Sequence, residues 1–254
     1  MHGALLAVPF GLAIGVSLGL VGGGGSILAL PVLVYVLDQP VKEATTTSLL
    51  IVGLTALAGS VAQARDGRVR VRLAVAFGAS GAIGAAAGTM LNRLASPQVI
   101  LLGFATLMLV AAYAMLRRGT QATPAGTRNE IAWRRVVPAG IAVGVLTGFF
   151  GVGGGFVIVP ALVLLLGFEM PVAVGTSLLI IALTSAFAFA AHLTSDGGID
   201  WAVTLAFTLA GIAGALAATS LGRNLSNARL TQTFAALIIA VACFLIAKNA
   251  GLVI

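Results

Sequence analysis

Long apolar runs separated by short polar segments make up almost the whole chain. A membrane-spanning helix needs about 20 consecutive apolar residues. The pattern predicts long spans over residues 44–64, 73–92, 98–116, 174–193, 201–222 and 230–247. Two further apolar stretches, 3–37 and 137–167, are each interrupted by a cluster of glycines. We therefore expect an all-α polytopic membrane protein.

One sustained polar segment divides this pattern into two halves. It covers residues 117–135, and we expect it to be a cytoplasmic linker. Residues 1–116 then form a first transmembrane repeat and residues 136–254 a second one. Each repeat is predicted to hold a glycine-broken or re-entrant helix pair followed by three long transmembrane helices.

The two halves carry the same motif, 129 residues apart. Residues 19–31 read GLVGGGGSILALP, and residues 148–160 read GFFGVGGGFVIVP. Downstream, Thr47-Ser48-Leu49-Leu50 corresponds to Thr176-Ser177-Leu178-Leu179. Paired glycine interruptions in the two halves of a membrane protein indicate the binding site of a transporter.

Composition excludes a soluble protein. Of the 254 residues 59% are hydrophobic and 8% are charged, against roughly 25% charged in a soluble domain. The net charge of +7 comes from basic residues clustered between apolar runs, as in juxtamembrane loops. No basic helix with interleaved aromatics is present, so we expect a lipid bilayer and no nucleic acid as partner.

The glycine clusters are predicted to open their helices inside the membrane. Glycine costs roughly 1 kcal/mol relative to alanine in a helix, and a half-helix is expected to begin at Ser26 and at Phe156. Its unpaired N–H groups and its dipole form an anion site without a formal charge. Hydroxyl groups of the Thr-Ser pairs add hydrogen-bond donors. The predicted substrate-binding residues are Gly22, Gly24, Gly25, Ser26, Thr47, Ser48, Gly151, Gly153, Gly154, Gly155, Thr176 and Ser177.

Glycines also permit close packing of membrane helices, and this is the alternative role for the two clusters. Packing needs spaced rather than contiguous small residues. Gly81, Gly84 and Gly88 have that spacing, so we predict that they contact a neighbouring helix. A P-loop is excluded, because no lysine follows either cluster.

The direction of the second half depends on how often each broken stretch crosses the membrane. An odd number of crossings per half gives inverted repeats, and an even number gives parallel repeats. Placing the loop Arg65–Arg72 in the cytoplasm gives a slightly larger excess of internal positive charge for the inverted arrangement. We favour inverted repeats, and the parallel arrangement stays open.

No catalytic set is found, so we predict no enzyme activity, cofactor or metal site. His2 and His192 do not build a metal site between them. We interpret His192 as interfacial rather than proton-coupling, and Arg93 and Arg223 as basic residues that extend from helix ends to the interface. With few ionisable groups in the spans, we hypothesise uncoupled anion efflux driven by the membrane potential.

The paired G-x-G-G-G/S motifs with their following Thr-Ser-Leu-Leu segments resemble the TauE/SafE family of sulfite and organosulfonate exporters. The resemblance covers nearly the whole chain, and the second copy is the closer match. It implies export of a small sulfur-containing anion across a bacterial inner membrane. The alternatives are a permease for another small anion and a membrane scaffold protein. The sequence sets neither the particular anion nor the oligomeric state.

Overall fold

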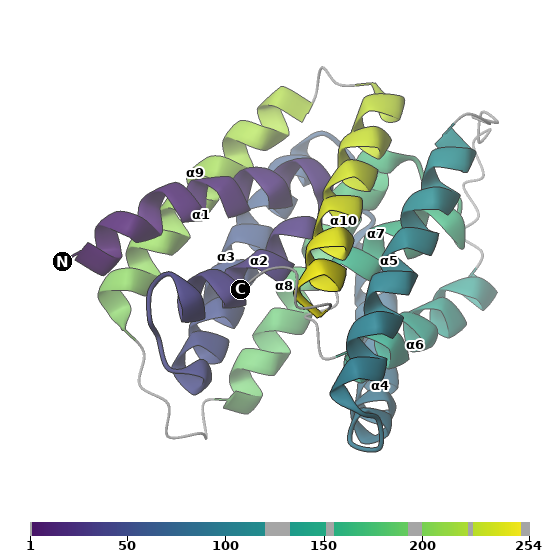
Figure 1. Cartoon of the computed structure of the whole chain (residues 1–254). Coiled ribbons are helices and arrows are strands. Elements are labelled where there is room, and N and C mark those ends of the chain that lie inside the picture. The colour runs from purple at the N-terminus through teal and green to yellow at the C-terminus, as the bar shows by residue number, and fades with distance from the viewer. Residues whose placement is uncertain (1, 120–132, 151–154, 193–199, 223–225, 250–254) are drawn as a thin grey trace.

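The computed structural model describes residues 2–119, 133–150, 155–192, 200–222 and 226–249, and every element in these ranges is an α-helix (Figure 1). The helices are α1 His2–Val21, α2 Gly24–Tyr35, α3 Val41–Arg65, α4 Val71–Asn92, α5 Pro97–Gly119, α6 Trp133–Phe150, α7 Gly155–Leu164, α8 Met170–His192, α9 Trp201–Gly222 and α10 Asn227–Asn249. The expected all-α class is confirmed.

By length and composition, α3, α4, α8 and α9 are long and apolar enough to cross a membrane. The helices α5 and α10 are each 23 residues long, but their apolar parts are shorter, Leu102–Arg117 and Asn227–Cys243. The four long spans are therefore the second and third elements that follow each glycine interruption. The middle of the predicted linker, residues 120–132, lies outside the described ranges.

The same local structure recurs 129 residues apart. At the end of α2, the N–H of Leu37 donates to Val32 O at 3.1 Å. The corresponding N–H of Leu166 after α7 donates to Ala161 O at 3.3 Å. The next turn also matches, because Asp38 has φ 51° and Gly167 has φ 73°. The two short helices thus end in the same left-handed turn, where a glycine is the usual residue.

The first helix of each half packs on a helix of the other half. The helix α1 lies along α9, and α6 lies along α4 (Figure 1). Both contacts are ladders of small residues at four-residue spacing, which lets two backbones approach closely. A Cβ added to any of the glycines that α1 and α6 contribute to these contacts would meet a backbone carbonyl of the opposite helix. The paired positions are Gly11 with Phe207, Gly15 with Gly211, Gly19 with Ala215, Gly140 with Phe77, Gly144 with Gly81 and Gly148 with Ala85.

The predicted packing role of the spaced glycines is confirmed. A Cβ on Gly84 would overlap Ile141, and one on Gly88 would overlap Val145. Gly81 faces Gly144 at the middle of the same ladder. In both ladders the residue numbers rise together, so each pair of helices runs in the same direction.

The helices α3 and α8 pack against each other in the opposite sense. Gly53 lies against Ser185, Gly59 against Leu178, and Gly175 against Gln63. The residue numbers of α3 rise as those of α8 fall, so the two helices are antiparallel. The helices α5 and α10 also contact each other across the two halves.

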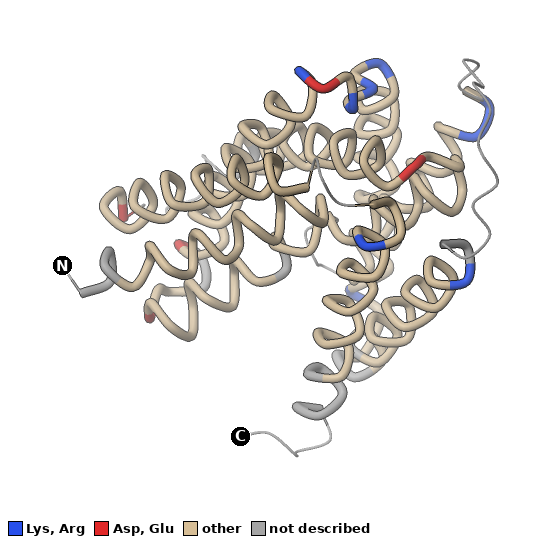
Figure 2. Tube along the Cα trace, turned by 90° about the horizontal axis from the view of Figure 1, so that it is seen from above, with Lys and Arg blue, Asp and Glu red and all other residues tan. Residues whose placement is uncertain are grey.

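Charged residues are unevenly distributed. Figure 2 shows acidic segments near the N-terminal end, whereas the basic segments that it colours, with acidic ones among them, gather toward the other side. Four arginines stand together at the α3–α4 connection, namely Arg65, Arg68, Arg70 and Arg72. One end of the bundle is therefore markedly more positive than the other.

Candidate functional site

The first glycine interruption is shorter than expected. The helix α1 ends at Val21 and α2 begins at Gly24, so Gly22 and Gly23 alone form the break. Gly22 has φ +79°, a left-handed conformation that an L side chain rarely adopts. The expectation of a half-helix beginning at Ser26 is corrected, because Gly24 and Gly25 already belong to the first turn of α2. One left-handed residue suffices to redirect the chain, and glycine tolerates the helical conformation that follows.

The second interruption also yields a half-helix slightly earlier than expected. The helix α7 begins at Gly155 rather than at Phe156. Gly151, Gly153 and Gly154 lie outside the described residues. Their predicted role in substrate binding therefore stays a prediction.

The first break touches the start of α7, the helix that follows the second break. A Cβ added to Gly23 would overlap the carbonyl group of Gly155. A Cβ on Gly155 would lie 2.5 Å from Ser26 Oγ and 3.2 Å from Gly23 O. The fold therefore brings together glycine motifs that stand 129 residues apart in the sequence.

The second Thr-Ser pair is attached to the first break. Ser177 Oγ donates to Val174 O at 2.8 Å and to Gly22 O at 3.2 Å. A Cβ on Gly22 would lie 2.5 Å from Ser177 Oγ. Ser177 thus links α8 of the second half to the α1–α2 break of the first.

The predicted hydroxyl donors differ in what they already bind. Ser26 donates to Gly23 O at 2.7 Å, and Ser48 donates to Thr45 O at 2.8 Å. Thr176 Oγ1 accepts the backbone N–H of Arg70 at 3.2 Å, so its own proton stays available to a further acceptor. Thr47 is fully buried and its Oγ1 has no hydrogen-bond partner. Of the predicted hydroxyl donors, Thr47 and Thr176 therefore have a proton that is not donated to another described group, whereas the serines already donate theirs.

The two Thr-Ser pairs are not adjacent. Since α3 and α8 are antiparallel, with Gly53 opposite Ser185, Thr47 and Thr176 lie on opposite sides of the crossing point. At 1.5 Å per residue their separation along the helices is roughly 20 Å. One small anion cannot contact both threonines at once.

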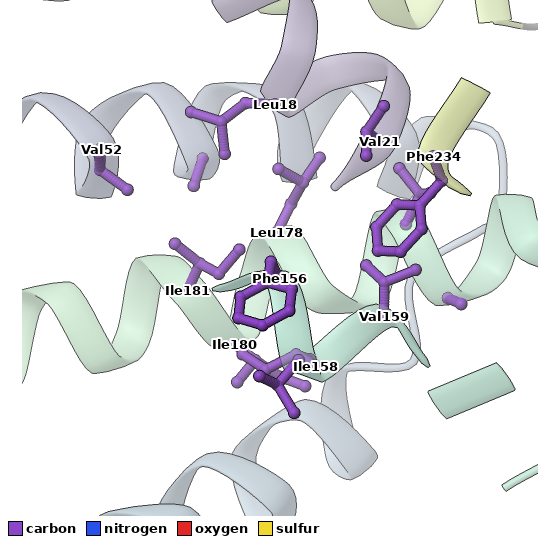
Figure 3. Packing of buried hydrophobic residues seen from close by; sticks show 14 of the residues in the cluster. Leu18, Val21, Val52, Phe156, Ile158, Val159, Leu178, Ile180, Ile181 and Phe234 are labelled. Atoms are coloured by element: carbon purple, nitrogen blue, oxygen red, sulfur yellow. The ribbon is translucent and has the colours of Figure 1, made fainter. Parts of the chain in front are cut away.

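The N-terminus of α2 has no side-chain cap, since Gly23 stands at the N-cap position without a hydrogen-bonding side chain. Its surroundings are mostly apolar side chains, with one buried hydroxyl among them. A Cβ on Gly24 would meet Leu237 and would lie 3.3 Å from Ser17 Oγ, which has no hydrogen-bond partner in the described part of the chain, and one on Gly25 would meet Leu18 and the backbone carbonyl of Ile14. Figure 3 shows the adjoining core, in which Leu18 and Val21 approach Phe156, Leu178 and Phe234. The first break is therefore closely packed among apolar side chains and a few serine hydroxyls.

A small hollow with a largely apolar lining, to which Gln63 and Arg68 add polar groups, lies beside the first break. Helix ends from both halves line it, through Gly19, Leu20, Gln63, Arg68, Pro171, Val174, Gly222 and Leu230. Sequence reasoning assigned the arginines of this loop to membrane orientation and missed Gln63 as part of a site. A glutamine closing an apolar run, five residues before an arginine, was the signal available.

Other polar residues contribute little to this region. Arg93 is exposed, and Cys243 is a free, exposed thiol. The side chain of His192, and the whole of Arg223, lie outside the description. Within the described ranges no cluster of three or more His, Cys, Asp or Glu is placed to hold a metal ion.

Comparison with known proteins places these features in a family. Residues 7–245 match the family described as "Sulfite exporter TauE/SafE". A "Probable membrane transporter protein" of Xylella fastidiosa (strain Temecula1) is 35% identical, over 96% of this chain and 95% of its own length. The "Probable membrane transporter protein YunE" of Bacillus subtilis is 26% identical, over 95% of this chain and 97% of its own. No solved structure matches. Because the family match spans nearly the whole chain, the protein belongs to the TauE/SafE family and is a membrane transporter rather than an enzyme.

Proposed function

We propose that this transporter exports a small sulfur-containing anion, such as sulfite or an organosulfonate, across the inner membrane of a bacterium. The anion binds near the middle of the membrane between the two glycine breaks. The observation that carries the proposal is the contact of Gly23 with Gly155, which joins the two motifs predicted to form one site. The family supports the substrate class.

The proposed site uses backbone groups rather than charges. The first turn of α2 has no side-chain cap, and the first residue of α7 contacts the α1–α2 break, so both helix N-termini lie near the junction, where an anion is favoured by the helix dipoles. Because these glycines are closely packed, the breaks must separate for an anion to pass. Each Thr-Ser pair then lines the path on its own side of the junction, with Thr47 and Thr176 as the free donors.

We propose further that the two repeats are inverted. The antiparallel contact of α3 and α8 supports this arrangement, since these helices occupy corresponding positions in the two halves. A twofold axis relating antiparallel neighbours lies perpendicular to them, and thus in the membrane plane. The α3–α4 loop is then cytoplasmic under the positive-inside rule.

Labelling of single cysteines tests the orientation of the first repeat, and with it the cytoplasmic position of the α3–α4 loop. In a Cys243→Ser background, Tyr35→Cys and Arg65→Cys place thiols at exposed positions at opposite ends of the α2–α3 segment. We expect an impermeant maleimide to label Tyr35→Cys from outside intact cells and Arg65→Cys only after lysis. Labelling of both from one side contradicts the proposed topology.

Transport is proposed to be uncoupled. An inside-negative potential drives an anion outward by about 2.3 kcal/mol per charge per 100 mV, so efflux needs no proton relay. Flux that is insensitive to an imposed potential contradicts this part of the proposal.

Flux measurements in proteoliposomes test the site and the substrate together. Radiolabelled sulfite, an organosulfonate, sulfate and chloride are compared for the wild type, Gly23→Ala and Gly78→Ala. The last is the matched control, because Gly78 is a buried glycine with nothing within 4 Å of an added Cβ. We expect saturable flux of a sulfur anion, lost in Gly23→Ala and kept in Gly78→Ala, with both variants eluting as folded protein.

The other outcomes are informative. Flux that survives in Gly23→Ala removes the breaks from the transport path and leaves them a packing role. Saturable flux of chloride alone replaces the sulfur anion by another substrate. Absence of flux for every anion from folded wild type contradicts anion transport itself.

A further inference from the structure

The polar groups that line the hollow beside the first break belong to Gln63 and Arg68. Gln63 is 4% exposed and lies in the last turns of α3. Arg68 Nη1 donates to Gln63 Oε1 at 3.5 Å, the long limit of a hydrogen bond. This contact occupies the amide oxygen of Gln63, so its NH₂ group and the remaining guanidinium N–H groups are what the hollow offers. Such a set accepts an anion and repels a cation.

The backbone holds Arg68 firmly in place. Its N–H donates to Gln63 O at 3.1 Å, after a turn in which Gly67 has φ +70°. A Cβ on Gly175 would lie 2.9 Å from Arg68 O. Two residues later, the N–H of Arg70 donates to Thr176. The α3–α4 loop is therefore fastened to the start of α8, and the Arg68 side chain starts from a fixed position.

The hollow adjoins the first break through shared residues. Val174 lines the hollow, and its Cα lies 3.0 Å from a Cβ built on Gly22. Gly19, another lining residue, stands one helical turn before Gly22 on α1. An anion held by Arg68 is thus about one turn of helix away from the junction of the two halves.

The second repeat has no basic residue at the position that corresponds to Arg68. Offsets of 129 and 130 map Arg68 onto Gly197 and Gly198, and Gly175 corresponds to Thr46. Both the cation and the glycine that accepts its loop occur in one copy only. The end that carries Arg68 is the positive end of the bundle (Figure 2).

We propose that Gln63 and Arg68 form an anion-loading site, which captures the transported anion at the positive end and passes it to the break at Gly22. The inference rests on the proposed anion transport and adds a site that makes the two ends unequal. The hollow has room for no more than about one water molecule, so an oxyanion enters only when the Arg68 side chain moves away from Gln63 and breaks their long hydrogen bond. Replacing that bond costs little, because it is long and the guanidinium gains an acceptor of opposite charge in place of a neutral amide oxygen.

The test uses full-length Arg68→Gln, Arg68→Lys and Gln63→Met, with Arg70→Gln as the matched control. Arg70 belongs to the same loop, its side chain is exposed, and it contributes only its backbone N–H to Thr176. In proteoliposomes we expect Arg68→Gln to raise the KM for the transported anion about tenfold or more. Maximal flux should change far less, and Arg68→Lys should fall between. Arg70→Gln should match the wild type.

Anion binding in detergent gives an independent measurement. We expect sulfite or sulfate to raise the unfolding temperature of the wild type and of Arg70→Gln, but not that of Arg68→Gln. Equal losses in Arg68→Gln and Arg70→Gln overturn the loading site in favour of general surface charge, and an unchanged KM in Arg68→Gln overturns it as well. If the wild type transports no anion, the proposed function fails. The binding measurement still decides the loading site, which is overturned if no anion stabilises the wild type.

Discussion

The two Thr-Ser pairs occupy corresponding positions in the two halves but have different neighbours. Both serines donate to the carbonyl three residues earlier in their own helix, but among the described residues Ser177 alone also reaches the glycine break of the other half, through Gly22 O. Thr176 accepts the backbone N–H of Arg70, whereas Thr47 is buried without a partner. A repeated backbone thus carries two chemically different sites.

The contrast follows from substitutions at a few positions on a shared frame. The ladders of α1 on α9 and of α6 on α4 use the same glycines, 129 residues apart. Next to the Thr-Ser pairs, Gly175 admits the α3–α4 loop, and Thr46 stands at its counterpart. The frame is symmetric where backbones pack closely, and it diverges where loops meet the breaks. The two ends of the molecule therefore present different polar groups.

The largest expected effect is a loss of stability when the close helix contacts shared by the two halves are disrupted. Gly15→Ala and Gly144→Ala each place a methyl group against a backbone carbonyl of the partner helix. Neither neighbour is a flexible side chain, so the helices must separate. We expect each variant to lose at least about 1–3 kcal/mol of stability, with similar losses in the two halves.

Thermal unfolding in detergent measures this loss. The control is Gly78→Ala, where an added Cβ meets nothing and the gain in helix propensity is at most about 1 kcal/mol. A large loss for one ladder and none for the other shows that the two halves do not share one packing scheme.

The next largest effect is a difference in stability between variants of the two serines. Ser177→Ala removes the donor to Gly22 O and leaves a buried carbonyl without that partner, at an expected cost of about 1–3 kcal/mol. Ser48→Ala removes only a bond within α3 and should cost a few tenths of a kcal/mol. Chemical unfolding of the two variants side by side checks the difference. Equal costs contradict a linking role for Ser177.

The sequence pattern predicted correctly which helix faces pack closely and where the helices are interrupted. The glycine clusters predicted both interruptions to within two residues, and the spacing of Gly81, Gly84 and Gly88 predicted a packing face. These are local properties of the chain. Whether a glycine opens a helix depends on its own backbone and on the residues beside it.

The choice of neighbour was beyond sequence reasoning. Gly11, Gly15 and Gly19 show that α1 has a small-residue face, but many helices in the chain have a similar one. Periodicity therefore does not reveal that α1 packs on α9 of the other half. For the same reason, the Arg68–Gln63 pair was not predicted, because only the approach of α8 to the α3–α4 loop makes these side chains line a hollow.

The smallest expected effect contrasts the two threonines. Thr176→Val removes the acceptor of the Arg70 N–H. Since that loop is partly exposed and water can replace the hydroxyl, we expect a loss of only about 1 kcal/mol. Thr47→Val removes a hydroxyl that bonds to nothing, so stability should be unchanged or slightly higher. Thr208→Val is the control for this second variant, because Thr208 is also buried and unpartnered but lies on α9, beside the α1 ladder. If Thr47 serves the anion path, Thr47→Val lowers flux at undiminished stability, whereas Thr208→Val changes neither. Equal flux in the two variants means that the unpaired hydroxyl of Thr47 has no part in transport, and the anion path in the first half then runs past its glycine break without help from this threonine.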